Sequence, residues 1–393
     1  MTAWMIAALG LGLPVYSYCG YPALLFLLAS AVQAWRDLTY LWRRTDRRCR
    51  WEGLPSVSVI IAAHNEEAVI EAKLRNTLVL RYPRERLEII VGSDGSDDAT
   101  EDIVRRFADQ GVRLLAFHER RGKLSVLNDC VREAKGEILL FSDANTMLEP
   151  DALTRLVRHF ADPGVGVVCG ELRLQGERRE TAYWHFEVTL KFLESRLDSA
   201  LGANGAIYAM RRALYPFPPK HLITDDFVIP MMARMRGYRI RYDPEALAHE
   251  EVTGNAGHEF RRRVRIGAGN FQALWCCRSL LLPWKGFVSL CFWSHKVLRW
   301  FTPFLLVTGL VASLCMIRTL PGRVLVAAQA GFYLLALLGH LLTRVGLHLT
   351  LLRLPGYFLL INAGLACGLF ELLLGRQKAA WERTARSAAE GMA

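Results

Sequence analysis

The first 35 residues contain no charged side chain, and this feature restricts the possible folds more than any other. Within them, Trp4–Leu28 is long enough to cross a bilayer as a helix, even with Pro14 inside it. No basic residue precedes the apolar run and no small-residue cleavage site ends it, so a cleaved signal peptide is not expected. We therefore predict a transmembrane segment over residues 1–35.

Three more apolar runs lie near the other end of the chain, and we predict that residues 300–375 form transmembrane helices. The runs are Trp300–Ile317, Val324–Thr343 and Leu354–Phe370. Residues 280–299 mix aromatic with basic side chains, which predicts an amphipathic segment at the membrane interface. A buried soluble helical bundle is the alternative, but four uncharged runs of 17 or more residues argue against it.

Basic residues mark the expected cytosolic side of the membrane. Residues 36–54 form a basic linker that contains Arg36, Arg43, Arg44, Arg47, Arg48 and Arg50. By the positive-inside rule the amino terminus faces outward and the next domain lies in the cytosol, at the cytoplasmic membrane. Four spans would then place the tail 376–393 outside, although Arg376, Lys378, Arg383 and Arg386 favour the inside. Which segment fails to cross is left open.

Between the apolar ends, residues 55–279 alternate strand-like and helix-like segments. The expected strands are Val57–Ala63, Leu87–Gly92, Val112–Phe117 and Glu137–Ser142. The expected helices are Glu67–Leu80, Asp98–Gln110 and Lys123–Ala134. This alternation predicts an α/β domain with a parallel sheet, in which ligands bind beyond the carboxyl ends of the strands.

Polar loops follow these strands in the places where a ligand is expected. They are His64–Glu67, Ser93–Thr100, Arg120–Lys123 and Asp143–Asn145. Each loop alone has a structural interpretation, such as an Asp-Gly-Ser turn or a helix cap at Asp98. The ordered set is more specific, because parallel strands bring all four loops to one edge of the sheet.

Several other classes of protein are not favoured. No G-x-G-x-x-G follows the first strand and no G-x-x-x-x-G-K-[ST] occurs, so nicotinamide and P-loop sites lose support. The nine cysteines form no C-x-x-C and no cluster with zinc spacing, and we expect reduced thiols. The net charge of +11 gathers at the membrane flanks without a groove-reading motif, which argues against a nucleic-acid partner.

The ordered motifs resemble those of membrane-bound family 2 glycosyltransferases of the type that builds bacterial exopolysaccharide. Over about Pro55–Gln272 the matching segments are Ala62–Glu67, Asp94–Thr100 (D-G-S-x-D-x-T), Gly122–Asn128, Asp143–Asn145 (D-x-D), Gly202–Arg212, Thr224–Asp226 (T-E-D) and Arg262–Ile266 (Q-x-x-R-W). The resemblance implies a Rossmann-like GT-A nucleotide-diphospho-sugar transferase domain with a mixed, mainly parallel sheet, flanked by transmembrane helices. It also implies an inverting hexosyl or N-acetylhexosaminyl transferase.

The resemblance assigns roles to residues around a nucleoside-diphosphate sugar, with UDP favoured. Glu66 and Asp94 would bind the nucleoside, and Lys123 would contact the diphosphate. Asp143 and Asn145 would hold a bridging Mg²⁺ or Mn²⁺ through oxygen ligands, with Asn145 replacing the second aspartate of the family. The expected catalytic base is Asp226. The residues expected around the acceptor and the diphosphate are Gly205, Asp225, Arg262 and Arg265.

Some of these residues keep a second interpretation. Asp225 and Asp226 can be two acids that begin a helix, and the arginines near Arg262 can bind anionic lipid. The expected partners are a nucleotide-sugar donor, a lipid-linked or glycan acceptor, the membrane and other polysaccharide-assembly proteins. Transfer to polyprenyl phosphate or a membrane glycolipid is an alternative. A non-catalytic sugar-nucleotide-binding subunit is another, kept open by Asn145 and by the altered Q-x-x-R-W segment.

That altered segment also bears on processivity. In processive relatives the tryptophan of Q-x-x-R-W stacks on the acceptor sugar, whereas this chain has Ile266 at that position and Arg262 in place of the amide. Isoleucine has no flat π face for a sugar ring. We therefore predict the addition of one sugar per encounter, unless Phe271 or Trp275 substitutes.

Overall fold

The computed structural model describes residues 2–43, 53–175, 181–251, 256–345, 347 and 350–376. The chain divides into two compact units. One covers Leu25–Gly254 and is called the α/β unit below; the other combines Met1–Leu24 with Asn255–Gln377 and is called the helical unit.

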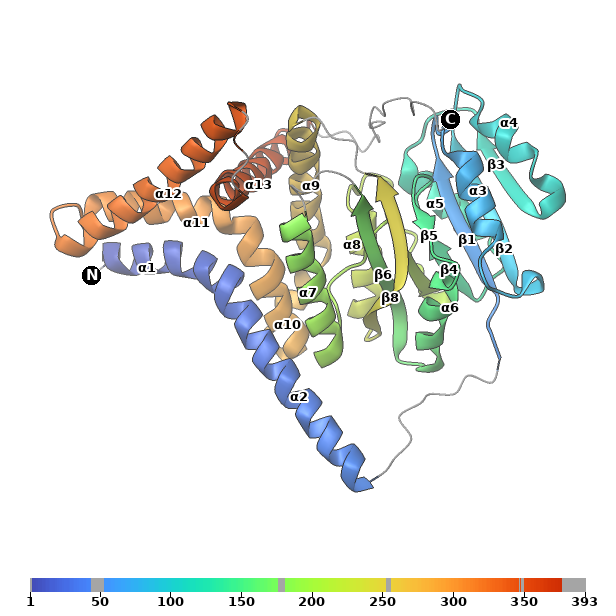
Figure 1. Ribbon diagram of the computed structural model, residues 1–393, viewed down its shortest axis with the longest axis horizontal. Helices are drawn as coiled ribbons and strands as arrows, with labels where there is room; N and C mark the ends of the chain where they lie inside the picture. The colour runs from blue at the N-terminus through green and yellow to red at the C-terminus, as the bar shows by residue number, and fades with distance from the viewer. Residues whose placement is uncertain are drawn as a thin grey trace. The chain divides into compact units, whose positions relative to one another are not determined.

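The α/β unit is built on an eight-stranded sheet in the order β3-β2-β1-β4-β7-β6-β8-β5 (Figure 1). Its strands are β1 (Val57–Ala63), β2 (Leu87–Asp94), β3 (Val112–Phe117), β4 (Ile138–Phe141), β5 (Met147–Leu148), β6 (Val165–Gln175), β7 (Tyr208–Arg211) and β8 (Arg239–Glu251). Strands β1 to β4 run parallel to one another, as do β6 and β8. Strand β7 runs antiparallel to β4 and β6, and β5 runs antiparallel to β8. The predicted mixed, mainly parallel sheet is confirmed.

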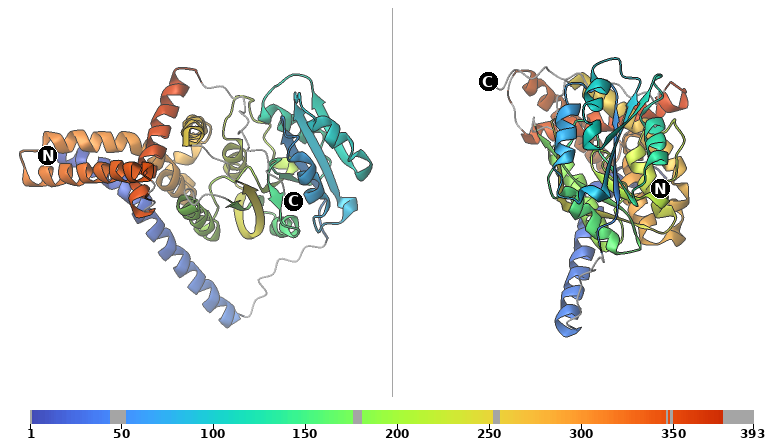
Figure 2. Two further views of the ribbon diagram at one scale, coloured as in Figure 1. Left: turned by 45° about the horizontal axis from the view of Figure 1, so that its top comes forward. Right: turned by 90° about the vertical axis from the view of Figure 1, so that its right-hand side faces the viewer.

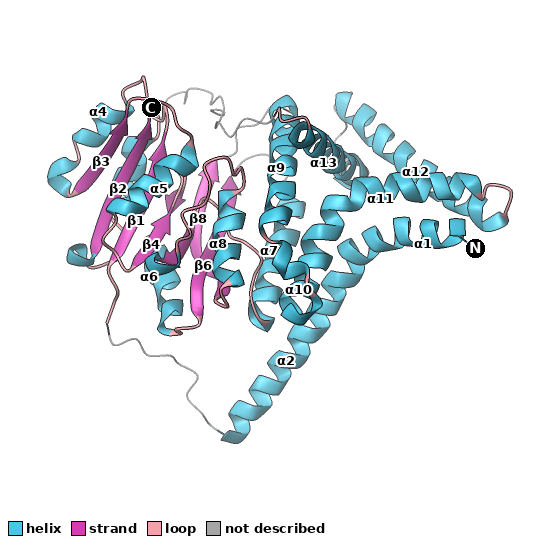
Figure 3. Cartoon of the chain, turned by 180° about the vertical axis from the view of Figure 1, so that it is seen from behind, coloured by secondary structure: helices cyan, strands magenta, loops and turns pink. Residues whose placement is uncertain are grey.

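Helices pack against both faces of this sheet (Figure 3). They are α3 (Ile70–Leu78), α4 (Thr100–Arg105), α5 (Lys123–Glu133), α6 (Ala152–Val157), α7 (Thr181–Leu197) and α8 (Asp225–Met235). Short 3₁₀ turns lie at Arg84–Arg86, Ala108–Gln110, Arg158–Ala161 and Arg212–Leu214. The strands at Val57–Ala63 and Val112–Phe117 have the predicted bounds, and the helix expected over 67–80 is shorter.

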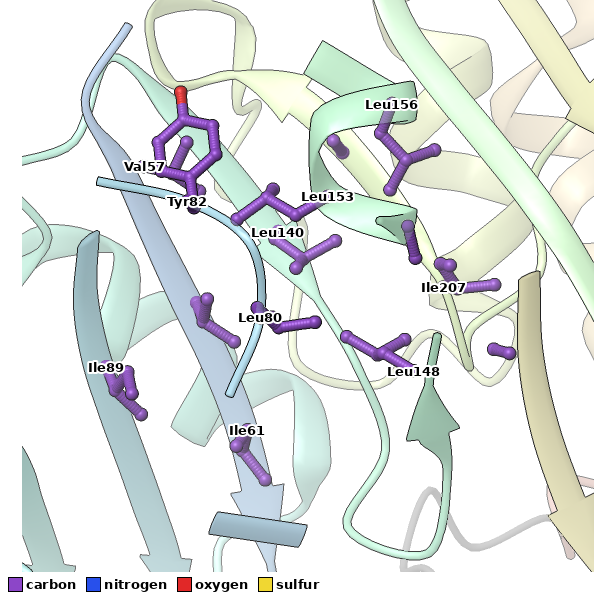
Figure 4. Packing of buried hydrophobic residues seen from close by; sticks show 14 of the residues in the cluster. Val57, Ile61, Leu80, Tyr82, Ile89, Leu140, Leu148, Leu153, Leu156 and Ile207 are labelled. Carbon is purple, nitrogen blue, oxygen red and sulfur yellow. The ribbon is translucent and has the colours of Figure 1, made fainter. Parts of the chain in front are cut away.

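The core of the α/β unit explains why the apolar runs form strands. All seven residues of β1 are buried, and its alternate residues Val57 and Ile61 pack with Leu140 of β4 and with Leu153 and Leu156 of α6 (Figure 4). Burial of each such side chain contributes about 1.5–3 kcal/mol to the stability of the folded state. This packing makes the sheet a rigid base for the loops at its carboxyl edge.

Gly92 of β2 lies unusually close to helix α5. A Cβ atom at this position would lie 2.2 Å from Val126 Cγ1 and 2.7 Å from Cys130 Sγ, well inside van der Waals contact. Only glycine leaves room for the helix at this distance. The contact sets the height of α5 above the sheet, and α5 begins at Lys123.

The helical unit contains closely packed apolar helices (Figure 2). They are α1 (Thr2–Val15), the start of α2 (Tyr21–Arg43), α9 (Ala256–Cys276), α10 (Phe287–Cys291), α11 (Leu298–Cys315), α12 (Leu320–Arg344) and α13 (Thr350–Leu373), with π-helical turns at Tyr16–Gly20 and Phe292–Val297 and 3₁₀ turns at Arg278–Leu281 and Pro283–Lys285. Glycines allow the closest approaches: a Cβ on Gly10 would lie 2.7 Å from the Gly309 nitrogen, and one on Gly368 would lie 2.5 Å from the Ala268 nitrogen. Small residues at helix crossings are typical of membrane proteins.

Four helical stretches are long and apolar enough to cross a membrane, which indicates a membrane protein. They are Thr2–Arg43, Phe287–Cys315, Leu320–Thr343 and Leu352–Leu373. Part of the segment 280–299 is continuous with α11, so its placement at the interface stays a prediction, as do the other domain bounds. Part of the basic linker, residues 44–52, and the tail beyond Arg376 lie outside the described residues.

Candidate active site

The loops after β1 and β2 are tied together at the carboxyl edge of the sheet. The Asn65 side chain bonds to Asp97 through both its oxygen and its nitrogen, and the Asn65 N–H donates to Ser96 Oγ at 3.2 Å. The Glu66 N–H donates to Thr100 Oγ1 at 2.8 Å. Asn65 adopts a left-handed backbone conformation, with φ of 55°, which turns the chain sharply after the strand. Glu66 is buried beside these contacts.

Asp94 is fully buried and joins a third loop to the first two. Its two carboxylate oxygens accept the N–H groups of Arg121 and Gly122 at 2.7 and 2.9 Å. Its carbonyl lies 2.9 Å from His64 Nδ1. In this structure Asp94 holds the loop that precedes Lys123, and its contact with a nucleoside base stays a prediction.

Lys123 and Asp143 meet directly. Lys123 is the first residue of α5, and Asp143 lies just beyond the end of β4. The Lys123 ammonium donates to Asp143 Oδ1 at 2.6 Å. Burial alone would lower the pKa of Lys123, but Asp143, Asp225 and Asp226 together raise it above its ordinary value. The lysine is therefore charged at neutral pH, as a group that binds a diphosphate must be.

Asn145 lies near a carboxylate from another strand. Its side-chain nitrogen donates to Glu250 Oε1 at 2.9 Å, and β8 brings Glu250 there because β5 and β8 pair through Met147 and His249. Among the described residues no group of three or more His, Cys, Asp and Glu side chains is arranged to hold a metal by itself. A cation carried on a diphosphate needs fewer protein ligands, and the oxygens of Asp143 and Asn145 fit that case.

Asp225 and Asp226 are the first two residues of α8, as the helix-start interpretation expects. The Gly205 N–H donates to Asp226 Oδ2 at 3.2 Å. Burial and, to a smaller extent, the neighbouring Asp225 raise the pKa of Asp226 to about 6, against the opposing effect of Lys123 and Lys191. Such a carboxylate is mostly ionised at pH 7 yet is a stronger base than an exposed aspartate.

One pocket of about 220 Å³, the part open to solvent included, collects several of these groups. The side chains of Lys123, Asp143 and Asp225 line it together with Gly205, and the rest of the wall is formed by apolar residues of β1, β4 and α5 and by Ser142 and Tyr208. Four of the ten predicted site residues therefore share one pocket, with Asp226 bonded to its wall. The arrangement can neutralise a leaving anion and take a proton within the same space.

The remaining predicted residues have other surroundings. Asp98 accepts the Thr100 N–H at 2.9 Å at the start of α4, in agreement with the capping interpretation. Arg262 and Arg265 lie on α9 in the helical unit, where Arg262 pairs with Glu259 at 3.6 Å. Their contact with the diphosphate stays a prediction.

Two buried lysines near the site were not predicted from the sequence. The Lys73 ammonium donates to Ser142 Oγ at 2.7 Å and to the Thr146 carbonyl at 2.6 Å, on either side of Asp143–Asn145. Burial lowers the pKa of Lys73 to about 7 although Asp143 opposes the shift. Lys191 bonds the segment before Gly205. In the sequence the only sign of such a residue is a lysine on an otherwise apolar helix face. Surface lysines occur in the same pattern, so the pattern does not distinguish a buried lysine from an exposed one.

Comparison with known proteins agrees with this geometry. The profile of Glycosyl transferase family 2 matches residues 58–219, which include β1 to β4 and every loop of the pocket up to Gly205. This domain belongs to glycosyl transferase family 2. The recognition and the enzyme class inferred from the motifs are thereby confirmed.

Relatives of the family 2 domain include synthases of a polysaccharide. The chain is 26% identical over 232 residues to the poly-beta-1,6-N-acetyl-D-glucosamine synthase of Staphylococcus aureus (strain COL), and 25% identical over 229 residues to that of Staphylococcus epidermidis. These matches cover 56% of this chain and 56% and 55% of the relatives. The chain thus spans a little over half the length of the curated relatives it matches.

A solved structure has the same fold over nearly the whole chain. It is the mannosyltransferase PcManGT from Pyrobaculum calidifontis in complex with GDP-Man and Mn²⁺, with a TM-score of 0.68 and 24% identity. The match covers 95% of this chain and 100% of that one. The GT-A-like fold with apolar helices at both ends is therefore confirmed.

Proposed function

We propose that this family 2 enzyme moves a sugar from a nucleoside-diphosphate donor to a lipid-linked or polysaccharide acceptor, with inversion, at the cytosolic face of the membrane. The observation that carries the proposal is the shared pocket: the Lys123 cation lines it, and Gly205 in its wall donates its N–H to the carboxylate of Asp226. The names of the staphylococcal relatives, synthases of poly-beta-1,6-N-acetyl-D-glucosamine, support an N-acetylhexosamine as the transferred sugar.

Each residue of the pocket has one task in this proposal. Lys123 leaves Asp143 and contacts the diphosphate, whose negative charge grows as the bond to the sugar breaks. Asp143 and Asn145 hold Mg²⁺ or Mn²⁺, which supplies further positive charge to the leaving group. Asp226 takes the proton of the acceptor hydroxyl as the oxygen attacks the anomeric carbon, and Gly205 keeps that carboxylate in place.

Membranes containing the protein, incubated with labelled UDP- and GDP-sugars, test the proposal. We expect one UDP-sugar to give labelled product that needs Asp226. Label in a lipid extract identifies a polyprenyl phosphate or glycolipid acceptor, and label in a water-soluble fraction identifies a glycan. Absence of transfer from every donor, with donor binding retained, would instead favour a non-catalytic binding subunit.

Purified protein in lipid is expected to add one sugar per encounter to a lipid-linked acceptor. Ile266 offers no stacking face, and Phe271, a candidate substitute, packs edge-on against Phe301 at a ring distance of 5.6 Å. Gel analysis of the product from one labelled donor measures its size. High-molecular-weight polysaccharide from this mixture would show that the protein polymerises alone.

The α/β unit is expected to face the cytosol, where nucleotide sugars are made. Labelling of introduced cysteines in sealed cells tests this, and we predict no external labelling at Asp46 or in the loop at Gly111. Asp46 lies outside the described residues, and Gly111 has a φ of 79° that disfavours cysteine, so the exposed neighbour Gln110 is the better position. Labelling of Gln110→Cys from outside would show that the α/β unit has the opposite orientation. Permeabilised cells, in which the position must react, provide the control.

A further inference from the structure

The turn that leads into β7 contacts Asp226 at two points. The Gly205 N–H donates to Asp226 Oδ2 at 3.2 Å, and the Ala203 N–H donates to the Asp226 carbonyl at 3.0 Å. The residue between them, Asn204, is buried, with its N–H 3.2 Å from Cys169 Sγ and its side-chain nitrogen 3.3 Å from the Gly170 carbonyl. The turn Ala203–Gly205 therefore fixes both the main chain and the side chain of Asp226.

Lys191 of helix α7 also holds this turn. Its ammonium donates to the Ala203 carbonyl at 3.2 Å and, over a very short distance, to Asn204 Oδ1. The side chain is almost fully buried, with 8% of the residue exposed. Within the described residues its ammonium bonds to these two uncharged oxygens and forms no ion pair with a carboxylate.

A buried ammonium without a carboxylate partner is costly, and an apolar residue of similar length would cost less. Stability of the fold alone therefore does not explain a lysine at this position. The lysine supplies two things that methionine cannot: charge-assisted hydrogen bonds to the turn, and a positive charge near the base.

We propose that Lys191 is a positioning residue for the catalytic base: it holds the Ala203–Gly205 turn so that the Gly205 N–H fixes the carboxylate of Asp226. This inference rests on the proposed function, in which Asp226 accepts the acceptor's proton. Lys191 acts through the turn and through its charge, without touching donor or acceptor.

The charges around Asp226 support this role. Asp225 faces it from the same helix, Lys123 from α5, Asp143 from the loop after β4, and Lys191 from α7. The two carboxylates raise the pKa of Asp226 and the two lysines lower it. In the proposed reaction Lys123 binds the donor diphosphate. Lys191 is then the lysine that stays with the base throughout the reaction.

Steady-state kinetics of the full-length protein in lipid test the proposal, with the UDP-sugar and the acceptor that the membrane labelling assay identifies. In Lys191→Met we expect kcat to fall about tenfold or more while the donor KM changes less than about twofold, because the loss falls on the step that the base performs. The acid limb of the kcat profile should move to higher pH, since removing a nearby cation raises the pKa of Asp226.

Two further variants separate positioning from folding. Lys191→Gln keeps hydrogen-bond donors but loses the charge, so we expect it to retain more turnover than Lys191→Met while showing the same displacement of the acid limb. Leu190→Ala removes a buried neighbour on the same helix and is expected to lower stability without moving that limb. Equal displacement in Leu190→Ala would reduce Lys191 to a structural role.

The result that overturns the proposal is a folded Lys191→Gln with wild-type kcat and an unmoved acid limb. The same measurements on Asp226→Asn distinguish this failure from failure of the proposed function. If Asp226→Asn is inactive while Lys191→Gln behaves as wild type, only the positioning role is wrong. If Asp226→Asn turns over normally, the base lies elsewhere and both proposals fall.

Discussion

Replacing Asp226 with asparagine is expected to reduce turnover by about 10²–10⁴-fold, the range that a general base contributes. In the proposed reaction the carboxylate acts on the acceptor proton, whereas Lys123 and Asp143 act on the donor. The donor's dissociation constant should therefore change little, and the loss should appear in kcat. Asparagine is nearly isosteric and can still accept the Gly205 N–H, so the local structure is preserved. Binding of labelled donor and kinetics on the same preparation measure both quantities.

Asp225→Asn is the matched control for this variant. It removes a neighbouring carboxylate that raises the pKa of Asp226, so the acid limb of kcat, expected near pH 6 in the wild type, should move to lower pH while Asp226 itself stays in place as the base. The sign follows from the chemistry: the base works when ionised, so activity rises as pH increases through its pKa. Near-normal turnover in Asp226→Asn would exclude this residue as the base.

Removing divalent cations is expected to abolish transfer. Lys123 brings one positive charge, which the carboxylate of Asp143 offsets, and this is too little to bind a diphosphate without a metal. Activity in excess chelator should therefore fall to background. Added Mn²⁺ or Mg²⁺ should restore it. Full activity in chelator would contradict the metal assignment.

Asn145→Asp tests the same assignment by binding rather than by activity. The substitution restores the second carboxylate of the D-x-D motif and should tighten Mn²⁺ binding in the presence of UDP, measured by calorimetry. Without metal, the new carboxylate lies against Glu250 and loses the 2.9 Å hydrogen bond, so the variant should also depend more on metal for stability. Asp143→Asn, which removes the other carboxylate, is the control with the opposite expected effect.

The first half of the fold follows from the sequence because its strands are continuous apolar runs between polar loops. Predicted helix ends are less accurate for local reasons. The helix expected from Glu67 begins at Ile70, because the Glu66 carbonyl first accepts the Val69 and Ile70 N–H groups in a turn. The helix expected to end at Gln110 ends at Arg105, and a separate 3₁₀ turn over Ala108–Gln110 follows before Gly111.

The candidate site was predictable as a set of loops but not as a network. Parallel strands place Asp94, Lys123 and Asp143 at one edge, and that much follows from their position after each strand. The contact of Asn145 with Glu250 depends on pairing between β5 and β8, which no local pattern specifies. Lys73 and Lys191 look like ordinary helix lysines in the sequence, and only their burial distinguishes them.

The space that Gly92 leaves for α5 limits how this chain can diverge over generations. Exposed residues of α4 can drift freely, because nothing in the pocket depends on them. At Gly92 even alanine, the smallest addition, requires the side chains of Val126 and Cys130, and with them the contact between α5 and the sheet, to shift. Selection on the position of the cation at the start of α5 is therefore expected to reach an apolar strand position outside the pocket lining, and a lineage that changed Gly92 is expected to change Val126 or Cys130 with it.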